Sequence, residues 1–291
     1  MGNLLKEDNE IKVSKSCFST FTNESLKYEG KEITDSLFAY RIHSGFFKSI
    51  DIEILDAIYN LKYSTSRQIT MYLNKVRNIT IEQSKVSKRL TTLNNSSAIC
   101  RYSFVNEERI DETNFKVYSL KNNGKRLLRS FHYQCYWNIF ECALLDDIKS
   151  ILARNQFILK LINSNIISYP EINFKTDIKG VEASYNYKNT AYFIIPVRSN
   201  LNEESIINIF TTLNNSLLFT TSINKKIIII GEDDVHLFNI FKIILKNKLI
   251  NLNILFFTSD LRIIERDIEK CTFKFGMNKE SNTVEIRETE F

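Results

Sequence analysis

The sequence of 291 residues contains only seven glycines, and none of them lies in a G-x-x-x-x-G-K-S/T or G-x-G-x-x-G run. Because phosphate-cradling loops are built on such glycine patterns, the chain lacks the signature of the common nucleotide-binding enzymes. It also lacks any apolar run near the roughly 20 residues that a membrane-spanning helix requires. We therefore expect a soluble, cytoplasmic protein that does not insert into a membrane.

Cysteine and histidine are also sparse and scattered. The chain has no C-x-x-C pair, and its five cysteines are Cys17, Cys100, Cys135, Cys142 and Cys271. This usage predicts reduced thiols in a reducing compartment. A zinc site built on His132 and Cys135 would need two distant ligands, and no serine or cysteine nucleophile has a neighbouring base. We therefore expect no metal, no cofactor and no enzymatic activity.

Composition indicates a soluble globular protein with more than one domain. Hydrophobic residues make up 43% and charged residues 25% of the chain, which is near the average for such proteins. Its length suits two domains. Residues 48–130 contain 15 lysines and arginines against 8 carboxylates, a net charge of +7, while the remainder carries −2. A basic segment beside a near-neutral one is typical of a protein that binds phosphates.

Three helices are predicted at the start of this basic segment. The first begins at Asp51, and residues 64–66 cap the second. Residues 80–83 fit a capping box, so the third helix is expected from Ile81 to about Asn94. The apolar side of this third helix is formed by Val86, Leu90 and Leu93.

The opposite side of the third helix carries hydroxyls and cations, with no carboxylate at its centre. Most solvated helix faces mix both signs of charge, so this one fits a groove of phosphates and base edges better than water. The alternative is an ordinary solvated face. The residues expected to contact bases are Ser84, Lys85, Lys88, Arg89 and Thr92. Those expected to hold phosphates are Ser66, Arg67, Arg77 and Lys116.

Two runs rich in β-branched and aromatic residues, 99–105 and 115–120, then predict a two-stranded ribbon. The pattern Tyr118-x-Leu120, Gly124 and Leu128 resembles the end of the wing in many bacterial winged-helix regulators. The resemblance implies that the tyrosine and leucine pack inward and that the glycine allows tight helix packing. The tip of this wing is acidic, which disfavours its insertion between phosphates; its charged residues are Glu107, Glu108, Arg109, Asp111 and Glu112.

A long aromatic-rich helix is expected from Lys125 to about Ser164, with one break near Asn155. Its broad apolar stripe consists of Phe131, Tyr136, Trp137, Phe140 and Leu144. This stripe either packs on the protein's own two domains or forms a homodimer interface. A two-fold dimer would match a palindromic DNA site.

The C-terminal part alternates strands and helices, which predicts an α/β layer with a right-handed parallel crossover. Strands are expected at 180–187, 190–197, 227–230 and 254–257, with edge strands near 272–275 and 283–286. Asn202 is expected to cap one helix. Asp233 or Asp234 is expected to cap the next.

This order of elements resembles the restriction-endonuclease-like fold. In that family, an acidic residue near a strand hairpin and a Glu-x-Lys on the next strand bind the catalytic metal. Asp177 or Glu182 matches the first carboxylate, but Pro196 and Arg198 stand where the second acid and the lysine belong. The resemblance therefore implies a degenerate nuclease without a cage for a divalent cation.

A winged helix followed by such a domain is similar to the replication-relaxation family of plasmids and mobile elements, over residues 51–261 at the level of pattern. The resemblance implies a plasmid-associated DNA-binding protein. The expected fold is α+β and α/β. It comprises an N-terminal arm (1–47), a winged helix-turn-helix domain (48–130), a connecting or dimerisation helix (131–165) and a C-terminal α/β domain (166–291).

The leading interpretation is a homodimer that binds double-stranded DNA sequence-specifically, as a transcriptional regulator or a replication or transfer accessory factor of a plasmid, phage or mobile element. The C-terminal domain would be free to take a small-molecule or protein partner. One alternative is a metal-dependent nuclease with Asp177, Glu182 and Glu232 as an atypical PD-(D/E)xK-like site. The other is a protein-interaction module whose winged helix does not bind DNA, which the acidic wing tip favours.

Overall fold

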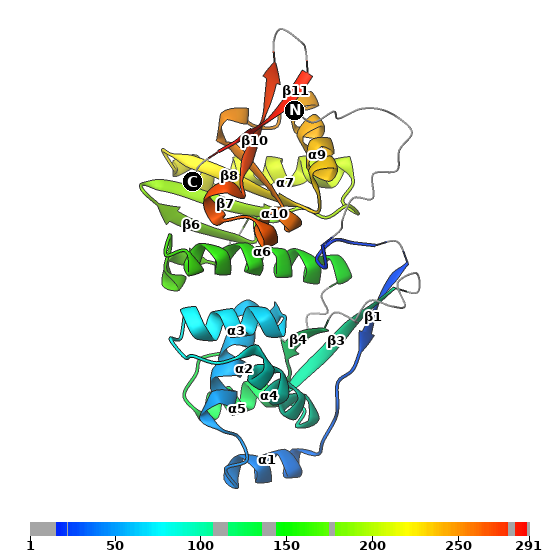
Figure 1. The fold of residues 1–291 in the computed structure, drawn as a ribbon, viewed down its shortest axis with the longest axis vertical. Coiled ribbons are helices and arrows are strands. Elements are labelled where there is room, and N and C mark those ends of the chain that lie inside the picture. The colour runs from blue at the N-terminus through cyan, green and yellow to red at the C-terminus, as the bar shows by residue number, and fades with distance from the viewer. Residues whose placement is uncertain are drawn as a thin grey trace.

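The computed structural model describes residues 16–21, 23–106, 116–135, 144–174, 178–278 and 283–289. Within these ranges the chain has a mixed α and β fold built on two sheets (Figure 1). A four-stranded sheet has the strand order β1-β3-β4-β2, and a seven-stranded sheet has the order β11-β10-β9-β8-β7-β6-β5. The expected mixture of helices and sheets is therefore confirmed. No helix in the described ranges has both the length and the apolar character needed to cross a membrane.

The smaller sheet is antiparallel throughout and packs on a group of helices. Its strands are β1 (Glu24–Tyr28), β2 (Tyr63–Ser64), β3 (Ile99–Asn106) and β4 (Lys116–Leu120). The helices of this part are α1 (Asp35–His43), α2 (Ser49–Leu61), α3 (Ser66–Lys75), α4 (Gln83–Asn95) and α5 (Asn122–Ser130).

Inward-facing residues of this part match the expected pattern. The predicted apolar side of α4 is fully buried, and Tyr118 and Leu120 of β4 join the same core. Gly124 of α5 lies so close to Ala98, the residue before β3, that a Cβ atom there would collide with the Ala98 carbonyl oxygen. The expectation that this glycine permits tight helix packing is therefore confirmed.

Local capping explains where α3 and α4 begin. Thr65 accepts a hydrogen bond from the backbone N–H of Gln68, and the Gln68 side chain accepts one in return, which forms the N-cap of α3. The predicted capping box at residues 80–83 is wrong, because α4 begins only at Gln83. Asn74 binds both the N–H and the carbonyl of Ile81 and thereby holds that residue outside the helix.

The N-terminal segment is more ordered than the arm expected from the sequence. Strand β1 pairs with β3, with Leu26 opposite Phe104, and Phe38 of α1 is fully buried in the helical core. These residues therefore pack with the predicted winged-helix segment. Residues 1–15 lie outside the described ranges.

Helix α6 (Leu145–Asn163) lies between the two sheets, with α3 beneath it (Figure 1). The prediction of one long helix from Lys125 with a break near Asn155 is wrong, because α5 ends at Ser130 and α6 continues unbroken through Asn155. The Asn155 amide is buried and donates to the carbonyl oxygens of Leu61 (3.0 Å) and Tyr63 (2.8 Å). This polar residue thus joins α6 to the smaller sheet. Part of the predicted aromatic stripe, residues 136–143, lies outside the described ranges.

The larger sheet has helices on both faces (Figure 1). Its strands are β5 (Ile172–Asn173), β6 (Ala183–Tyr187), β7 (Thr190–Pro196), β8 (Lys225–Gly231), β9 (Leu255–Ser259), β10 (Phe273–Asn278) and β11 (Thr283–Glu288). Its other helices are α7 (Glu203–Asn215), α8 (Leu217–Thr221), α9 (Asp234–Lys246) and α10 (Asp260–Glu265), with 3-10 turns at Tyr169–Glu171, Leu252–Ile254 and Ile268–Lys270.

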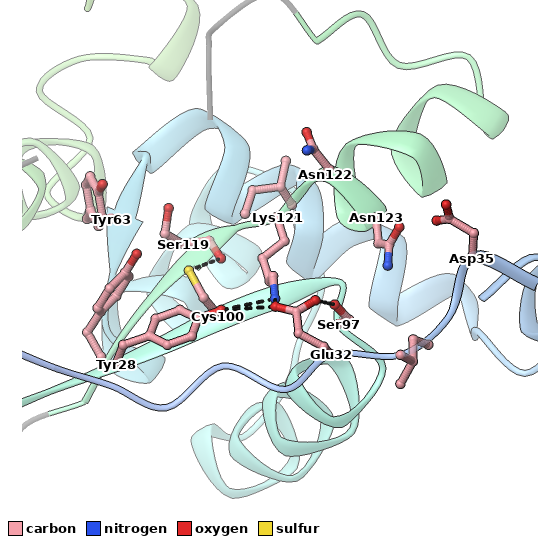
Figure 2. Close-up of a pocket in the computed structure, with 13 residues that line it drawn as sticks. Tyr28, Glu32, Asp35, Tyr63, Ser97, Cys100, Ser119, Lys121, Asn122 and Asn123 are labelled. Atoms are coloured by element: carbon pink, nitrogen blue, oxygen red, sulfur yellow. Dashed lines mark hydrogen bonds and ion pairs between the residues drawn. The ribbon is translucent and has the colours of Figure 1, made fainter. Parts of the chain in front are cut away.

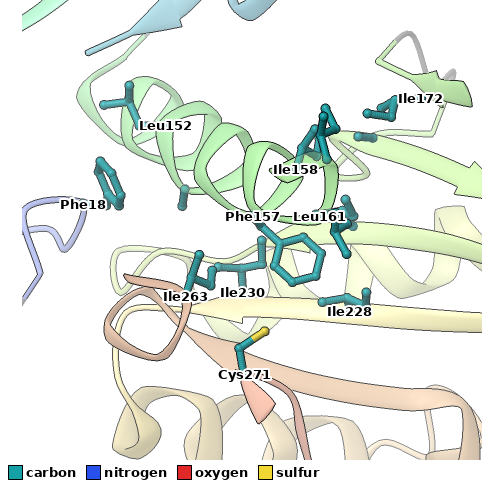
Figure 3. Close-up of a cluster of buried hydrophobic side chains, with 14 of the residues drawn as sticks. Phe18, Leu152, Phe157, Ile158, Leu161, Ile172, Ile228, Ile230, Ile263 and Cys271 are labelled. Atoms are coloured by element: carbon teal, nitrogen blue, oxygen red, sulfur yellow. The ribbon is translucent and has the colours of Figure 1, made fainter. Parts of the chain in front are cut away.

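The strand pairing of this sheet agrees with the sequence pattern. Strands β7, β8 and β9 are parallel, and the expected hairpin of β6 and β7 turns at Lys188 and Asn189, which both have positive φ. Asn202 caps α7 and Asp233 caps α9, as expected. Figure 3 shows α6 above the sheet with Phe157 directed at it, in one apolar cluster with Ile228 and Ile230 of β8. Phe104 of the smaller sheet belongs to the same cluster, so α6 connects the two sheets through apolar contact.

Candidate nucleic-acid interface

The outward side of α4 is open. Ser84, Lys85 and Lys88 are exposed, and Thr92 is half-buried with its hydroxyl donating to the Lys88 carbonyl oxygen within the helix. The nearest acidic residue along the helix is Glu82 at its N-cap, 4.0 Å from the Lys85 ammonium. The side chains on this surface are therefore hydroxyls and cations that no described part of the chain covers.

Arg89, one of the predicted base contacts, is held inside the fold instead. Its guanidinium donates from two nitrogens to the carboxylate of Asp51, which is fully buried at the start of α2. The same carboxylate accepts the backbone N–H of Lys48 at 2.8 Å. Arg89 therefore fixes α4 to α2 and is not available to read a base.

Arg77, one of the predicted phosphate contacts, is likewise engaged within the molecule. It pairs with Glu53 at 2.8 Å and with Asp56 at 4.0 Å, and it donates to the hydroxyl of Tyr133. These bonds connect the end of α3 to α2 and to the segment after α5. Arg77 is therefore assigned a structural role.

A hollow of about 420 Å³ borders one flank of α4. It is lined by residues from α3, α4, the β3–β4 ribbon, α6, α10 and the N-terminal segment: Cys17, Phe18, Thr65, Ser66, Arg67, Gln83, Ser87, Thr91, Arg101, Lys116, Tyr118, Gln156 and Ile264. Three of the predicted phosphate contacts, Ser66, Arg67 and Lys116, meet here. The Gln83 amide donates to the Ser66 hydroxyl at 3.0 Å, which ties the starts of α3 and α4 together.

The cations around this hollow differ in whether they form an ion pair. Arg101 pairs with Glu29 at 2.6 Å, and the hydrogen bond from Ser103 together with this pair holds the pKa of the Glu29 carboxyl below its usual value of 4.5. Arg67 and Lys116 are exposed and form no ion pair with a carboxylate of the described residues. Positive charge therefore remains available on two sides of the hollow.

The lining residues that the sequence analysis did not predict include the polar side chains of Gln83, Ser87, Thr91 and Arg101. Gln83, Ser87 and Thr91 recur every four residues and therefore lie along one side of α4, next to the side that was predicted to contact bases. Arg101 could have been found from strand alternation, because it shares a face of the ribbon with Lys116 and Tyr118. The acidic wing tip at 107–115 lies outside the described residues.

A second hollow of about 520 Å³ lies on the opposite face of the same ribbon (Figure 2). Cys100, Tyr102 and Ser119 line it, whereas Arg101, Lys116 and Tyr118, on the other face of the ribbon, line the hollow beside α4. The Lys121 ammonium lies at its edge and binds the carboxylate of Glu32, as Figure 2 shows. Because Lys121 is paired with Glu32, this face presents less positive charge to a polyanion than the α4 face does.

The carboxylates considered for a nuclease site have other partners. Glu182 lies 3.4 Å from Arg154, whose guanidinium is buried, and Glu232 accepts hydrogen bonds from the Thr20 hydroxyl and from the N–H of Ser199. Asp177 lies outside the described residues. Among the residues that the structure describes, no group of three histidine, cysteine or acidic side chains could hold a metal ion.

Comparison with known proteins found no matching family model, no similar curated protein and no similar solved structure. Function is therefore inferred from the residues of this chain alone. The most distinctive arrangement is a helix face of hydroxyls and lysines beside a hollow whose Arg67 and Lys116 form no ion pair with a carboxylate of the described residues. Such a surface suits a phosphate-bearing polymer.

Proposed function

We propose that residues 48–130 form a winged helix-turn-helix that binds double-stranded DNA sequence-specifically. The order of elements supports this proposal: α2, the short strand β2, α3, α4 and then the ribbon of β3 and β4, with β2 pairing to β4. This is the order that the winged-helix class uses to present one helix to the major groove. The class of protein proposed is therefore a DNA-binding protein.

In this proposal α4 is the helix that enters the groove. Ser84, Lys85 and Lys88 are its exposed donors, and Thr92 follows them one turn later. A major groove about 12 Å wide accepts a helix, and lysine and hydroxyl groups hydrogen-bond to base edges there. The Arg89–Asp51 pair keeps α4 at a fixed angle on α2, so its role is to position the helix.

Phosphate contacts would come from the hollow beside α4. Arg67 lies in the first turn of α3, where the helix dipole also favours an anion, and Lys116 opens the second strand of the ribbon. The two cations lie on different sides of the hollow, so a phosphate backbone could bind along it. Such contacts fix the register of a duplex without reading its sequence.

The proposed biological role is that of a transcriptional regulator, or of a replication or transfer accessory factor, of a plasmid, phage or other mobile element. A homodimer on a palindromic site is part of this proposal. The larger sheet, with α6 before a hairpin and a parallel crossover after it, is compatible with a restriction-endonuclease-like fold in which Arg198 replaces the expected lysine. The observation that carries the whole proposal is the uncovered, carboxylate-free centre of the α4 face.

A footprint of the purified protein on the DNA upstream of its own gene tests the proposal. Protection of a short palindrome is the expected result. Affinity should also fall steeply with salt, since each neutralised phosphate releases about 0.9 counterion from B-DNA. Equal binding to all duplexes at low salt, with no protected site, would contradict sequence-specific recognition.

A further inference from the structure

A second cluster of polar residues lies where three parallel strands end. Arg198 comes just after β7, Glu232 follows β8, and Asp260 follows β9. All three are almost fully buried, and the guanidinium of Arg198 binds both carboxylate oxygens of Asp260, at 2.7 and 3.3 Å. Ligands of α/β proteins bind in the crevice outside such strand ends, so this is the position where an occupant is expected.

The occupant of this crevice is the protein's own N-terminal segment. Ser16 donates to Asp260 at 3.3 Å, and Thr20 donates to Glu232. Arg198 donates to the carbonyl oxygen of Phe18 at 3.3 Å. The Phe18 ring is 4% exposed and lies in the apolar cluster beneath α6, as Figure 3 shows. Hydroxyls, a backbone carbonyl and an aromatic ring are thus all recognised in a segment that forms a turn, in which the N–H of Ser19 donates to the carbonyl oxygen of Ser16 and the N–H of Phe18 donates to the Ser16 hydroxyl.

One buried lysine connects this segment to strand β1. Lys149 of α6 is fully buried, and its ammonium binds both the carbonyl oxygen of Ser19 and the carboxylate of Glu24, the first residue of β1. From Glu24 the chain continues as β1 along the edge of the smaller sheet, paired with β3. Residues in the crevice and residues in the sheet therefore share a single cation.

The same segment borders the proposed DNA-binding surface. Cys17 and Phe18 line the hollow that also contains Arg67 and Lys116. Removing this segment from the crevice would change the wall of the hollow and, through Lys149 and β1, the support of the ribbon.

We propose that residues 16–21 and 23–28 form a regulatory strap: the crevice at the ends of β7, β8 and β9 is a peptide-binding site, and its occupation by Ser16–Thr20 controls strand β1 and the DNA-binding surface. The ligand class of the crevice is a turn-forming peptide with hydroxyl side chains four residues apart and an aromatic residue between them. The link to DNA rests on the proposed function; the link between crevice and β1 does not.

Hydrogen exchange of the full-length protein tests the strap. Thr20→Val removes the hydroxyl that bonds to Glu232 and to the Ser199 hydroxyl, without changing the shape of the side chain. Exchange should become about tenfold faster both in residues 16–21 and in β1, because one hydrogen bond to a buried charged acceptor is lost. Strand β4 should keep its protection. Thr211→Val is the matched control, since that hydroxyl is exposed on α7 and bonds only within its own helix.

If the crevice and β1 are coupled, the coupling acts in both directions, so a substitution in β1 gives a second test that leaves the residues of the crevice unchanged. Leu26→Ala weakens the packing of β1 on the apolar cluster, and it should accelerate exchange of residues 16–21 as well. Faster exchange confined to the mutated end in either variant would overturn the strap, as would unchanged exchange at both ends of Thr20→Val.

A duplex titration with Thr20→Val then tests the regulatory part. A change of at least threefold in affinity relative to Thr211→Val supports control of the DNA-binding surface, and unchanged affinity with a loosened strap overturns it. If the wild-type protein binds no duplex at all, the proposed function fails while the exchange experiment still decides whether the strap exists.

Discussion

Replacing Arg89 by alanine should destabilise the protein. The Asp51 carboxylate is fully buried and has two partners, the Arg89 guanidinium and the backbone N–H of Lys48. Removing one partner of a buried ion pair typically costs about 3–5 kcal/mol, because a charge remains buried without compensation. The Arg89 side chain is 21% exposed and the Lys48 bond remains, so the expected loss is smaller than for a fully buried pair, about 2–3 kcal/mol.

Urea-induced unfolding followed by far-UV circular dichroism measures this loss. Lys88→Ala, one residue away on the exposed side of the same helix, is the matched control and should change stability by less than about 0.5 kcal/mol. An Arg89→Ala protein as stable as the wild type, with a selective loss of duplex affinity, would refute the structural role assigned to this arginine.

Three further substitutions test other parts of the fold. Glu29→Gln should lower the free energy of unfolding at pH 7. Because the pKa of Glu29 is held below 4.5 in the folded protein, the difference in stability between the variant and the wild type should shrink as the pH falls below 4.5. A difference in stability that is independent of pH would argue against the pair with Arg101 and the bond from Ser103. Gly124→Ala should destabilise by about 1–3 kcal/mol in thermal unfolding, since the new Cβ would collide with the Ala98 carbonyl, and an unchanged melting temperature would contradict that contact. Asn155→Leu should cost about 1–3 kcal/mol for each buried group that loses its partner, namely the Tyr63 carbonyl and the Arg154 guanidinium that donates to the Asn155 oxygen, whereas the Leu61 carbonyl keeps Arg154 as a donor; a neutral result in urea unfolding would mean that water replaces the amide.

Local patterns in the sequence predicted the elements whose signals are themselves local. The β6–β7 hairpin follows from its turn residues, the caps Asn202 and Asp233 from their position before apolar periods, and the packing of Gly124 from its place after the ribbon. For the hairpin and the two caps the physical cause lies within a few residues of the signal, whereas Gly124 packs against Ala98 across the ribbon and was identified from the resemblance. Such features can be recognised without knowledge of the tertiary structure.

Features that depend on distant partners were not predicted. Arg89 looked like an exposed cation on the helix wheel, but its partner Asp51 is 38 residues away in the sequence. Asn155 suggested a helix break, and its amide instead satisfies two carbonyls about 90 residues earlier. Strand β1 has no strong period of its own and is ordered by β3. Ion pairs and edge strands are therefore the main source of error in identifying the candidate site.

The most direct test of DNA recognition by α4 compares two lysines of the same unit. Lys88 lies on the open face of α4, whereas Lys75 is exposed at the end of α3 beside Asp56 and Tyr169, away from that face. Each lysine-to-alanine variant is titrated against the footprinted duplex at several salt concentrations. We expect Lys88→Ala to weaken binding by about 1–3 kcal/mol while Lys75→Ala binds like the wild type. Equal affinity of both variants and the wild type would contradict the assignment of α4 to the groove.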